Sequence, residues 1–488
     1  MKVFLPILTL GLFLSFFLSN CSKETFHTGD VTLEFSKDTL RFDTIFTQVG
    51  SATRSFKIFN PLDKSVKISK LYMELGADSK FNINVDGLPG GVVTDVEIGP
   101  NDSIYVFAEV TVDPDQPLSV SPFILNENLV IETNGGRQNV VLEAWGQNAN
   151  YIPSNNNAGS VALLSCDFGT ETWDDPRPYV IYGVLVIQDC TLKLPPGTRL
   201  YVHGGVALSP EKVVYSDGII YVGKKGGLVI EGVEGDPVII QGDRLEEEFV
   251  DVPGQWAGIR YATGSLPGNI RHAKVLNSIV GIRADSAANL TLNNVEIRNS
   301  ASSGLVGVTA KIKATNCLFA DNGGYGAQFE IGGNYDLNYC TIANYGNEKS
   351  ALRLSNLICL NQNCSEYLDD DLVARINNCI LFGSQKDEIE LFDGETAGFD
   401  YQIKNTIVRV KDLTKETAYP DFFNHCNPCI NATGDDKIFV DVDEQNYKLD
   451  TLSIAEQKAV PILGVTDDLI GTMRDNSAPD IGCYEYEY

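Results

Sequence analysis

The most regular feature of the chain is a short pattern of apolar and polar residues that recurs in its second half. The pattern begins at residues 273, 295, 317 and 340, in steps of 22, 22 and 23 residues. A second pattern, a glycine followed by an apolar residue, begins at residues 258, 281, 304 and 326 and continues at Ala351 after a step of 25. Two patterns that keep one period predict a solenoid whose coils are built from short strands.

Within each predicted coil, apolar and polar residues alternate, as they do on strands with one buried face. We therefore expect apolar side chains inside the solenoid and polar ones outside, with coils about 4.8 Å apart. The solenoid is predicted over residues 160–455, with a longer side loop at 361–371. Residues 456–488 are predicted to cap its last coil, because an open strand edge invites aggregation.

The first part of the chain, residues 30–149, has a different pattern of short alternating runs separated by turn residues. A good hairpin signal lies at Asn134-Gly135-Gly136. Repeated short strands at this spacing predict an antiparallel sandwich of the immunoglobulin type. The runs predicted as strands are 31–35, 54–59, 66–71, 81–85, 104–112, 129–132 and 140–144. The fold class is therefore all-β, an immunoglobulin-like β-sandwich followed by a parallel β-helix.

The first twenty residues have the pattern of an export signal, with Lys2 ahead of an apolar run over residues 3–17. That run is too short for a membrane span. The following residues, Leu18 to Cys21, resemble the lipobox of bacterial lipoproteins. The resemblance implies that residues 1–20 are removed and that Cys21 becomes the lipidated first residue of a tether, 21–29. Ser22 fits sorting to the outer membrane; the alternative is an ordinary secretory signal.

Charge and cysteine content limit which binding partners, metals and disulfides are expected. The formal net charge of −28 argues against nucleic acid and against anionic lipid headgroups. Setting Cys21 aside, ten of the 11 cysteines remain in a compartment that permits disulfides. No cofactor or metal is expected, because the CxxC at 426–429 has no second ligand pair. We expect the disulfides Cys359–Cys364 and Cys426–Cys429, and buried free thiols at Cys317, Cys340 and Cys379.

Two arginines are the leading candidates for a binding site. Arg260 and Arg283 each follow an inward apolar residue at the same place in adjacent coils, so both should point outward. Two guanidinium groups one coil apart can hold the carboxylates of an acidic glycan. His272 lies between them in the sequence and could abstract a proton, as in a polysaccharide lyase. The alternative is that the arginines form ordinary surface ion pairs.

Two runs of acidic residues, at 246–248 with Asp251 and at 369–371, are interpreted as solvated loops. Paired carboxylates can hydrolyse glycosides and clustered ones can bind calcium, but neither run has the alternating spacing of a calcium loop.

Resemblance to known families also indicates where in the cell the protein is located. Residues 241–245 and 254–259 resemble the right-handed parallel β-helix lipoproteins of Bacteroidetes, whose solenoid is pectate-lyase-like. The sandwich segments 46–51, 59–60 and 145–147 resemble domains attached to many such lipoproteins. Residues 479–486, with 447–449, Asp468 and Arg474, resemble the "choice-of-anchor Q" closing motif. The resemblance implies a cell-surface protein of the outer membrane. It implies no reaction, because the family holds both enzymes and non-catalytic proteins.

The sequence thus favours a non-catalytic surface lipoprotein that presents its β-helix to a polysaccharide or a surface protein. One alternative is a polysaccharide lyase or glycoside hydrolase acting on an acidic glycan near Arg260, His272 and Arg283. The other is a structural adhesin with no small ligand.

Overall fold

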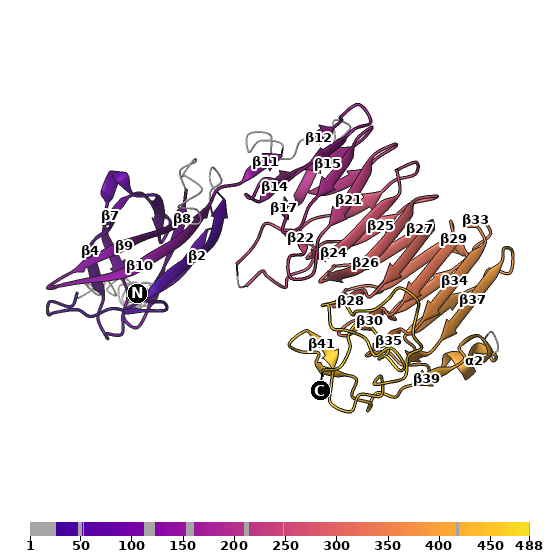
Figure 1. Cartoon of the computed structure of the whole chain (residues 1–488). Coiled ribbons are helices and arrows are strands. Elements are labelled where there is room, and N and C mark those ends of the chain that lie inside the picture. The colour runs from indigo at the N-terminus through magenta and orange to yellow at the C-terminus, as the bar shows by residue number, and fades with distance from the viewer. Residues whose placement is uncertain are drawn as a thin grey trace, which may run out of the picture. The chain divides into compact units, whose positions relative to one another are not determined.

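The computed structural model describes residues 26–46, 51, 53–111, 123–152, 161–208, 214–246, 248–415 and 419–487. The expected export signal, Cys21 and part of the tether lie outside these residues. The chain divides into two compact units, residues 1–148 and 149–488. The first is a β-sandwich and the second is a parallel β-helix (Figure 1), so the predicted fold class is confirmed.

The sandwich consists of two five-stranded sheets that share one apolar core. Alternating residues such as Phe56, Ile58 and Leu142 point into this core and are buried. One sheet has the order β1 (Glu34–Phe35), β3 (Arg54–Phe59), β8 (Ser103–Val110), β5 (Phe81–Val85) and β6 (Leu88–Pro89). The other has the order β2 (Thr39–Phe46), β10 (Gly136–Gln147), β9 (Phe123–Thr133), β4 (Val66–Met73) and β7 (Val92–Ile98).

The predicted strands 54–59 and 81–85 coincide with β3 and β5. The predicted hairpin joins β9 to β10, where Thr133 pairs with Gly136. The sequence did not predict β2 or β7. Strand β2 pairs with β10 in a parallel register, which sequence order alone does not indicate. A short 3₁₀ helix, η1 (Gly76–Asp78), follows β4.

In the described part of the second unit, the main element is a 25-stranded sheet wound into coils with three faces, here called A, B and C (Figure 1). Face A contains β12 (Val161–Leu164), β15 (Val184–Ile187), β20 (Ile219–Val222), β23 (Gly258–Tyr261), β25 (Ile282–Ala284), the first halves of β27 (Leu305–Thr315) and β29 (Ala327–Asn338), β31 (Leu352–Ser355) and β36 (Ile389–Phe392).

Faces B and C complete each coil. Face B contains β13 (Thr170–Thr172), β16 (Thr191–Leu194), β21 (Gly227–Glu231), the first halves of β24 (Gly268–Leu276) and β26 (Asn289–Arg298), the second halves of β27 and β29, β34 (Leu372–Asn377) and β37 (Phe399–Lys404). Face C contains β11 (Asn150–Ile152), β14 (Tyr179–Tyr182), β17 (Arg199–His203), β22 (Val238–Gly242), the second halves of β24 and β26, β28 (Leu318–Ala320), β30 (Thr341–Asn344), β35 (Ile380–Gly383), β38 (Thr406–Val408) and β39 (Cys429–Asn431).

Both recurring patterns of the sequence fall in register on these faces. On face C, Ala273 pairs with Val295 and Leu318 pairs with Thr341. On face A, Ile259 pairs with Ile282, and the row continues through Leu305, Ala327 and Leu352. The predicted period is therefore the length of one coil. At Gly258 the backbone has φ +116° and a side chain would collide with the Val280 carbonyl, so this position requires glycine.

Apolar side chains fill the interior of the coils, and most are fully buried. The expected disulfides Cys359–Cys364 and Cys426–Cys429 are present. Cys317, Cys340 and Cys379 are buried free thiols, as predicted. A third disulfide, Cys166–Cys190, was not predicted; its separation of 24 residues, close to one coil, was the available signal.

The C-terminal segment does not cap the last coil as expected. It runs along the outer side of face C, where Tyr447, Ile481 and Cys483 pack against β28, β30 and β35. Residues of these strands that would otherwise face solvent, such as Leu318 and Ile380, are consequently buried. The interior is closed instead by the segment with η4 (Leu413–Lys415) and α2 (Phe422–His425). The hairpin β40 (Phe439–Asp441) and β41 (Asn446–Leu449) belongs to the covering segment.

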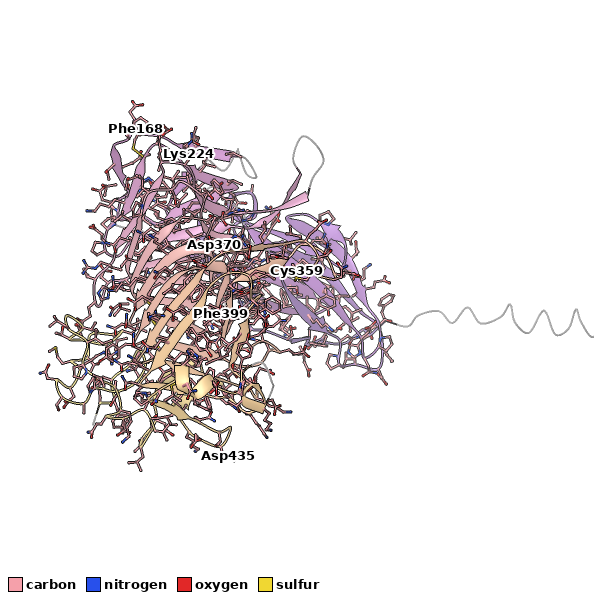
Figure 2. The ribbon with its side chains drawn as sticks, turned by 90° about the vertical axis from the view of Figure 1, so that its right-hand side faces the viewer. Phe168, Lys224, Cys359, Asp370, Phe399 and Asp435 are labelled. Carbon is pink, nitrogen blue, oxygen red and sulfur yellow. A yellow bond between two sulfur atoms is a disulfide. The ribbon has the colours of Figure 1, made fainter. Side chains whose placement is uncertain are left out.

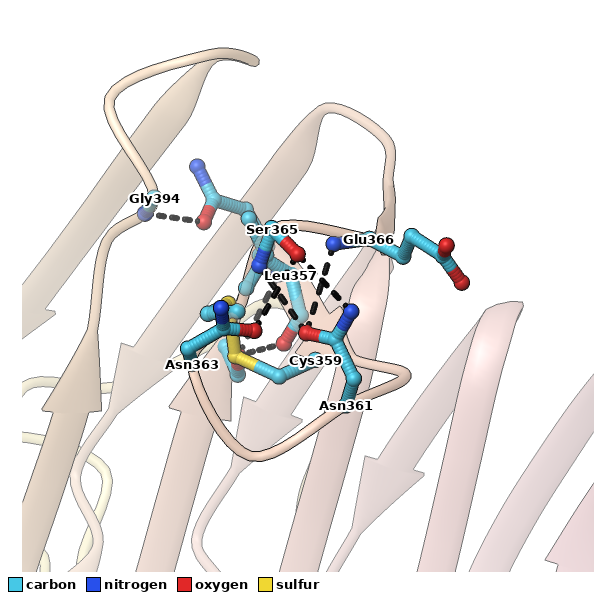
Figure 3. Close-up of a disulfide and its surroundings, with 10 residues drawn as sticks. Leu357, Cys359, Asn361, Asn363, Ser365, Glu366 and Gly394 are labelled. Carbon is cyan, nitrogen blue, oxygen red and sulfur yellow. Dashed lines mark hydrogen bonds between the residues drawn. A yellow bond between two sulfur atoms is a disulfide. The ribbon is translucent and has the colours of Figure 1, made fainter.

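Two hairpins project from the corners of the coils, β18 (Gly205–Leu208) with β19 (Val214–Asp217), and β32 (Leu357–Cys359) with β33 (Tyr367–Asp369). The second is the side loop predicted at 361–371. Phe168 and Lys224 lie near one end of the β-helix and Asp435 near the other (Figure 2). The disulfide Cys359–Cys364 closes the hairpin loop, and Asn361 and Ser365 hydrogen-bond across it (Figure 3).

Candidate ligand-binding site

The two predicted arginines lie side by side on the outer side of face A. In β23, Ile259 and Tyr261 point inward and are buried, so Arg260 between them points outward. Arg283 has the same place in β25, and the two residues pair directly across adjacent strands. The alternation of a strand and the constant coil length therefore bring them together, as the sequence predicted.

A carboxylate that the sequence analysis did not single out holds both arginines. Asp285 accepts a hydrogen bond from Nε of Arg260 at 2.7 Å and one from Nε of Arg283 at 2.8 Å, each on a different oxygen. Asp285 is only 9% exposed. We call these three residues the arginine clamp. The signal in the sequence was spacing, because Asp285 follows Arg283 by two residues and so lies on the same side of the strand.

The clamp leaves much of its hydrogen-bonding capacity unused. Among the described residues, neither arginine has another hydrogen-bond or ion-pair partner. Their side chains are 44% and 40% exposed. The terminal Nη groups of both guanidiniums are therefore available to a ligand, while the Nε bonds to Asp285 fix their orientation. The trio carries one net positive charge on a strongly acidic protein.

The residues that flank the clamp on face A are apolar or aromatic. Tyr221 pairs with Arg260 on one side, and its ring centroid lies 5.9 Å from the guanidinium. Val306 pairs with Arg283 on the other side and is nearly buried. No acid lies in register directly beside the two arginines, so a bound anion would meet no carboxylate of this row there.

Further along the same row, Arg353 has a different environment. Its Nε donates to Glu330 at 2.7 Å, and its Nη1 contacts Glu390. Gln328 donates to the same Glu330 oxygen at 2.9 Å, and the Tyr325 hydroxyl donates to Glu390 at 2.8 Å. We call Arg353, Glu330 and Glu390 the arginine–glutamate cluster. Two acids surround one cation here, so the group is a poor anion site.

His272 does not join the arginines. It lies at the corner between faces B and C, in the middle of β24, with φ +43°. Asn294 and Asn316 have the equivalent corner position in the next coils. His272 lines a separate hollow of 260 Å³ with Glu234 and Ile470. Burial lowers the pKa of His272, and the neighbouring Arg271 charge lowers it further. The grouping of His272 with Arg260 and Arg283 is therefore wrong, because the face B half of β24 separates His272 from Arg260 and the face C half separates it from Arg283.

The acidic runs have two different outcomes. Asp369, Asp370 and Asp371 are exposed, as expected for a solvated loop. In the first run, Glu248 and Asp251 are exposed as expected, and Glu247 lies outside the described residues. Glu246 is only 9% exposed, and its two carboxylate oxygens share the Nε–H of Arg244 in a local ion pair. Among the described residues, no group of acids, histidines and cysteines is arranged to hold a metal ion. None of the helices in the described part of the chain has the length and apolar character needed to cross a bilayer.

No protein-family model matches the chain, and no curated protein matches it either. Solved structures share local similarity. A protein of unknown function from Porphyromonas gingivalis W83 matches 28% of this chain and 59% of its own length at 13% identity, with a TM-score of 0.19. A PapD-like domain of human CEP192 matches 27% of this chain and 94% of its own at 11% identity, with a TM-score of 0.17.

A third structure, the catalytic unit of the GH87 α-1,3-glucanase from Streptomyces thermodiastaticus strain HF3-3, matches more of the chain. The similarity covers 72% of this chain and 73% of that one at 9% identity, with a TM-score of 0.23. Similarities at this level carry no argument about function, which must come from the residues of the site.

Proposed function

We propose that the protein binds an acidic polysaccharide on face A of its β-helix without cleaving it. The observation that carries the proposal is the arginine clamp, in which one buried carboxylate orients two partly exposed guanidiniums and, among the described residues, leaves their Nη groups without a hydrogen-bond partner. Paired guanidiniums recognise a carboxylate or sulfate through several charge-assisted hydrogen bonds. A repeated polymer suits a surface whose side chains recur at one coil spacing, about 4.8 Å.

The clamp is better suited to binding than to chemistry. Proton abstraction needs a base within hydrogen-bond reach of the substrate. Asp285 uses both of its oxygens on the arginines, and His272 lies at another corner. The alternative, a lyase or hydrolase acting on an acidic glycan, is therefore kept as an outcome of the test.

The test is binding of polygalacturonate, alginate, a sulfated galactan and a neutral glucan, measured by affinity electrophoresis and calorimetry. At least one acidic polymer should bind and the neutral glucan should not. Arg283→Ala should weaken binding about tenfold, because half of the donor set is lost. Arg375→Ala is the matched control, since Arg375 is an exposed arginine paired with Asp400 on face B.

Two results would contradict the proposal. Failure of every acidic polymer to bind would favour the alternative that the protein is a structural adhesin with no small ligand. Release of unsaturated, ultraviolet-absorbing products or of reducing ends, abolished by Arg283→Ala, would establish the enzyme instead.

The proposed location is the cell surface, with the protein attached to the outer membrane through lipid on Cys21. The lipobox-like residues 18–21 support this location. The mass of the mature N-terminal peptide from the native host should include the lipid, and Cys21→Ala should release the protein from membranes. An unmodified N-terminus beginning at another residue would contradict the anchor.

A further inference from the structure

A second hollow lies near the clamp, at the corner between faces A and B. Its volume is 310 Å³, and Phe168, Thr191, Lys225 and Leu266 contribute to its lining. These residues come from four successive coils: Phe168, Lys225 and Leu266 lie between the face A and face B strands of their coils, and Thr191 is the first residue of the face B strand β16. Leu266 follows β23, the strand that carries Arg260.

Phe168 is the most unusual residue of this hollow. It is 69% exposed, although an aromatic ring of this size usually finds cover. Its backbone has φ +64°, a region that bulky residues rarely adopt. The neighbouring disulfide Cys166–Cys190 and the bond from the Phe168 amide to the Asp189 carbonyl hold this turn in place. The ring is thus presented to solvent on a fixed support.

The charge beside the ring is positive. The ammonium of Lys225 lies 5.1 Å from the centroid of the Phe168 ring. Lys224 and Lys225 are both exposed, and neither forms an ion pair among the described residues. Together with Arg260 and Arg283, they give this side of the early coils four cations, against the carboxylate of Asp285 in the clamp and those of Asp167 and Asp189 next to the lining residues of the hollow, so the group keeps one net positive charge. In a chain with a net charge of −28 this grouping is complementary to an acidic ligand.

We propose that the Phe168 hollow is a second subsite for the acidic glycan, which stacks a sugar ring on Phe168 and places an acidic group at Lys225. This inference rests on the proposed function of the clamp. The C–H face of a pyranose packs well on an electron-rich aromatic face, and the face of the Phe168 ring opposite Lys225 is the one that a sugar would use. Phe168 precedes Arg260 by three coils, roughly 14 Å at the usual strand spacing. One chain of several sugars can therefore reach both sites.

Chain length separates the two subsites in an experiment with the whole protein. A digalacturonate is long enough for the clamp alone, whereas an octagalacturonate reaches both; oligomannuronates of the same lengths run in parallel. Phe168→Ala should lower the affinity for the octasaccharide about fivefold and leave the disaccharide unchanged. Phe168→Trp should retain the wild-type affinity, and Lys225→Met should reproduce part of the loss.

The control variant is Phe423→Ala, because Phe423 is an exposed aromatic residue on α2, far along the chain from the hollow. Unchanged octasaccharide affinity in Phe168→Ala would overturn the second subsite while leaving the clamp intact. Arg283→Ala should weaken both ligands, because the clamp binds both, so only the Phe168 variants test the second subsite. If the wild-type protein binds neither length, the clamp and the subsite are both wrong.

Discussion

Arg283 and Arg353 have the same place in the outer row of face A, three coils apart, yet their surroundings are opposite. In the clamp, two arginines share the single carboxylate of Asp285. In the arginine–glutamate cluster, one arginine contacts both Glu330 and Glu390. The first group has guanidinium N–H groups to spare, and the second has acceptors to spare.

This difference shows what turns an outward arginine into a binding residue. Position on the face is equal for both residues, so it does not decide the role. The ratio of cations to acids around each side chain decides it, because two carboxylates around one arginine make the local field unfavourable for an anion. The clamp is therefore expected to act in binding and the cluster in stability.

The largest effect expected from this comparison is on stability. Arg353→Ala leaves Glu330, which is 7% exposed, without its cation, and should lower the free energy of unfolding by about 2–3 kcal/mol. Arg283→Ala should cost less, because Arg260 still neutralises Asp285. Urea unfolding of both variants measures this. Equal stability losses would show that the two groups do not differ as described.

A buried acid next to the cluster, Glu388, should add a pH dependence to the stability of this region. Glu388, fully buried, accepts hydrogen bonds from the backbone amides of Gln385 and of Ala351, just before the strand of Arg353. Burial raises its pKa to about 7. Since the folded-state pKa lies above the unfolded value of 4.5, the folded protein retains this proton while the unfolded chain releases it.

The stability that Glu388 contributes is thus present at low pH and is lost as the pH rises through 7. Between pH 5 and pH 8 the loss should be roughly 2 kcal/mol. Glu388→Gln should remove this slope, so that the difference between variant and wild type changes with pH. Parallel stability profiles of the two proteins would show that Glu388 does not titrate in this range.

A smaller effect tests the geometry of the clamp. Arg283→Lys keeps the positive charge but replaces the planar guanidinium and its several donors by one ammonium group. That ammonium would pair with Asp285 and would not be available to the ligand. Binding of the acidic polymer should weaken about fivefold. The same substitution at Arg375 is the control. Full retention of affinity by Arg283→Lys would mean that charge alone, without the oriented Nη groups, explains binding.

The smallest effect is a gain. Glu390→Gln removes one of the two acids that surround Arg353 and should strengthen binding of the acidic polymer about twofold, in line with the modest value of exposed ion pairs. Glu390 is suitable because its side chain is 40% exposed. A loss of affinity in this variant would mean that the cluster itself contacts the ligand. Calorimetry at low salt measures either a gain or a loss of affinity, since salt screening weakens the electrostatic effect at high salt.

Much of the β-helix was predictable because its signals are local. Alternation along a strand set the inward Ile259 and Ile282 and the outward Arg260 and Arg283, and a constant coil length set their pairing. The disulfide Cys359–Cys364 was readable from its short loop. The prediction failed for His272, because it rested only on the position of His272 between the two arginines in the sequence, and the fold puts this residue at the corner between faces B and C rather than on face A. It also failed for the C-terminal segment, whose position depends on the outer side of face C rather than on the end of the chain.

The sequence by itself determined the all-β class, the coil period and which strand residues point inward or outward. These follow from a two-residue alternation along each strand and a repeat of about 23 residues. Only the tertiary structure decided how many acids surround each outward arginine. The partner Glu390 reaches Arg353 across an inserted hairpin that breaks the period, and Asp285 bridges two separate coils. Contacts between coils depend on the length of every intervening loop, and no local pattern carries that information.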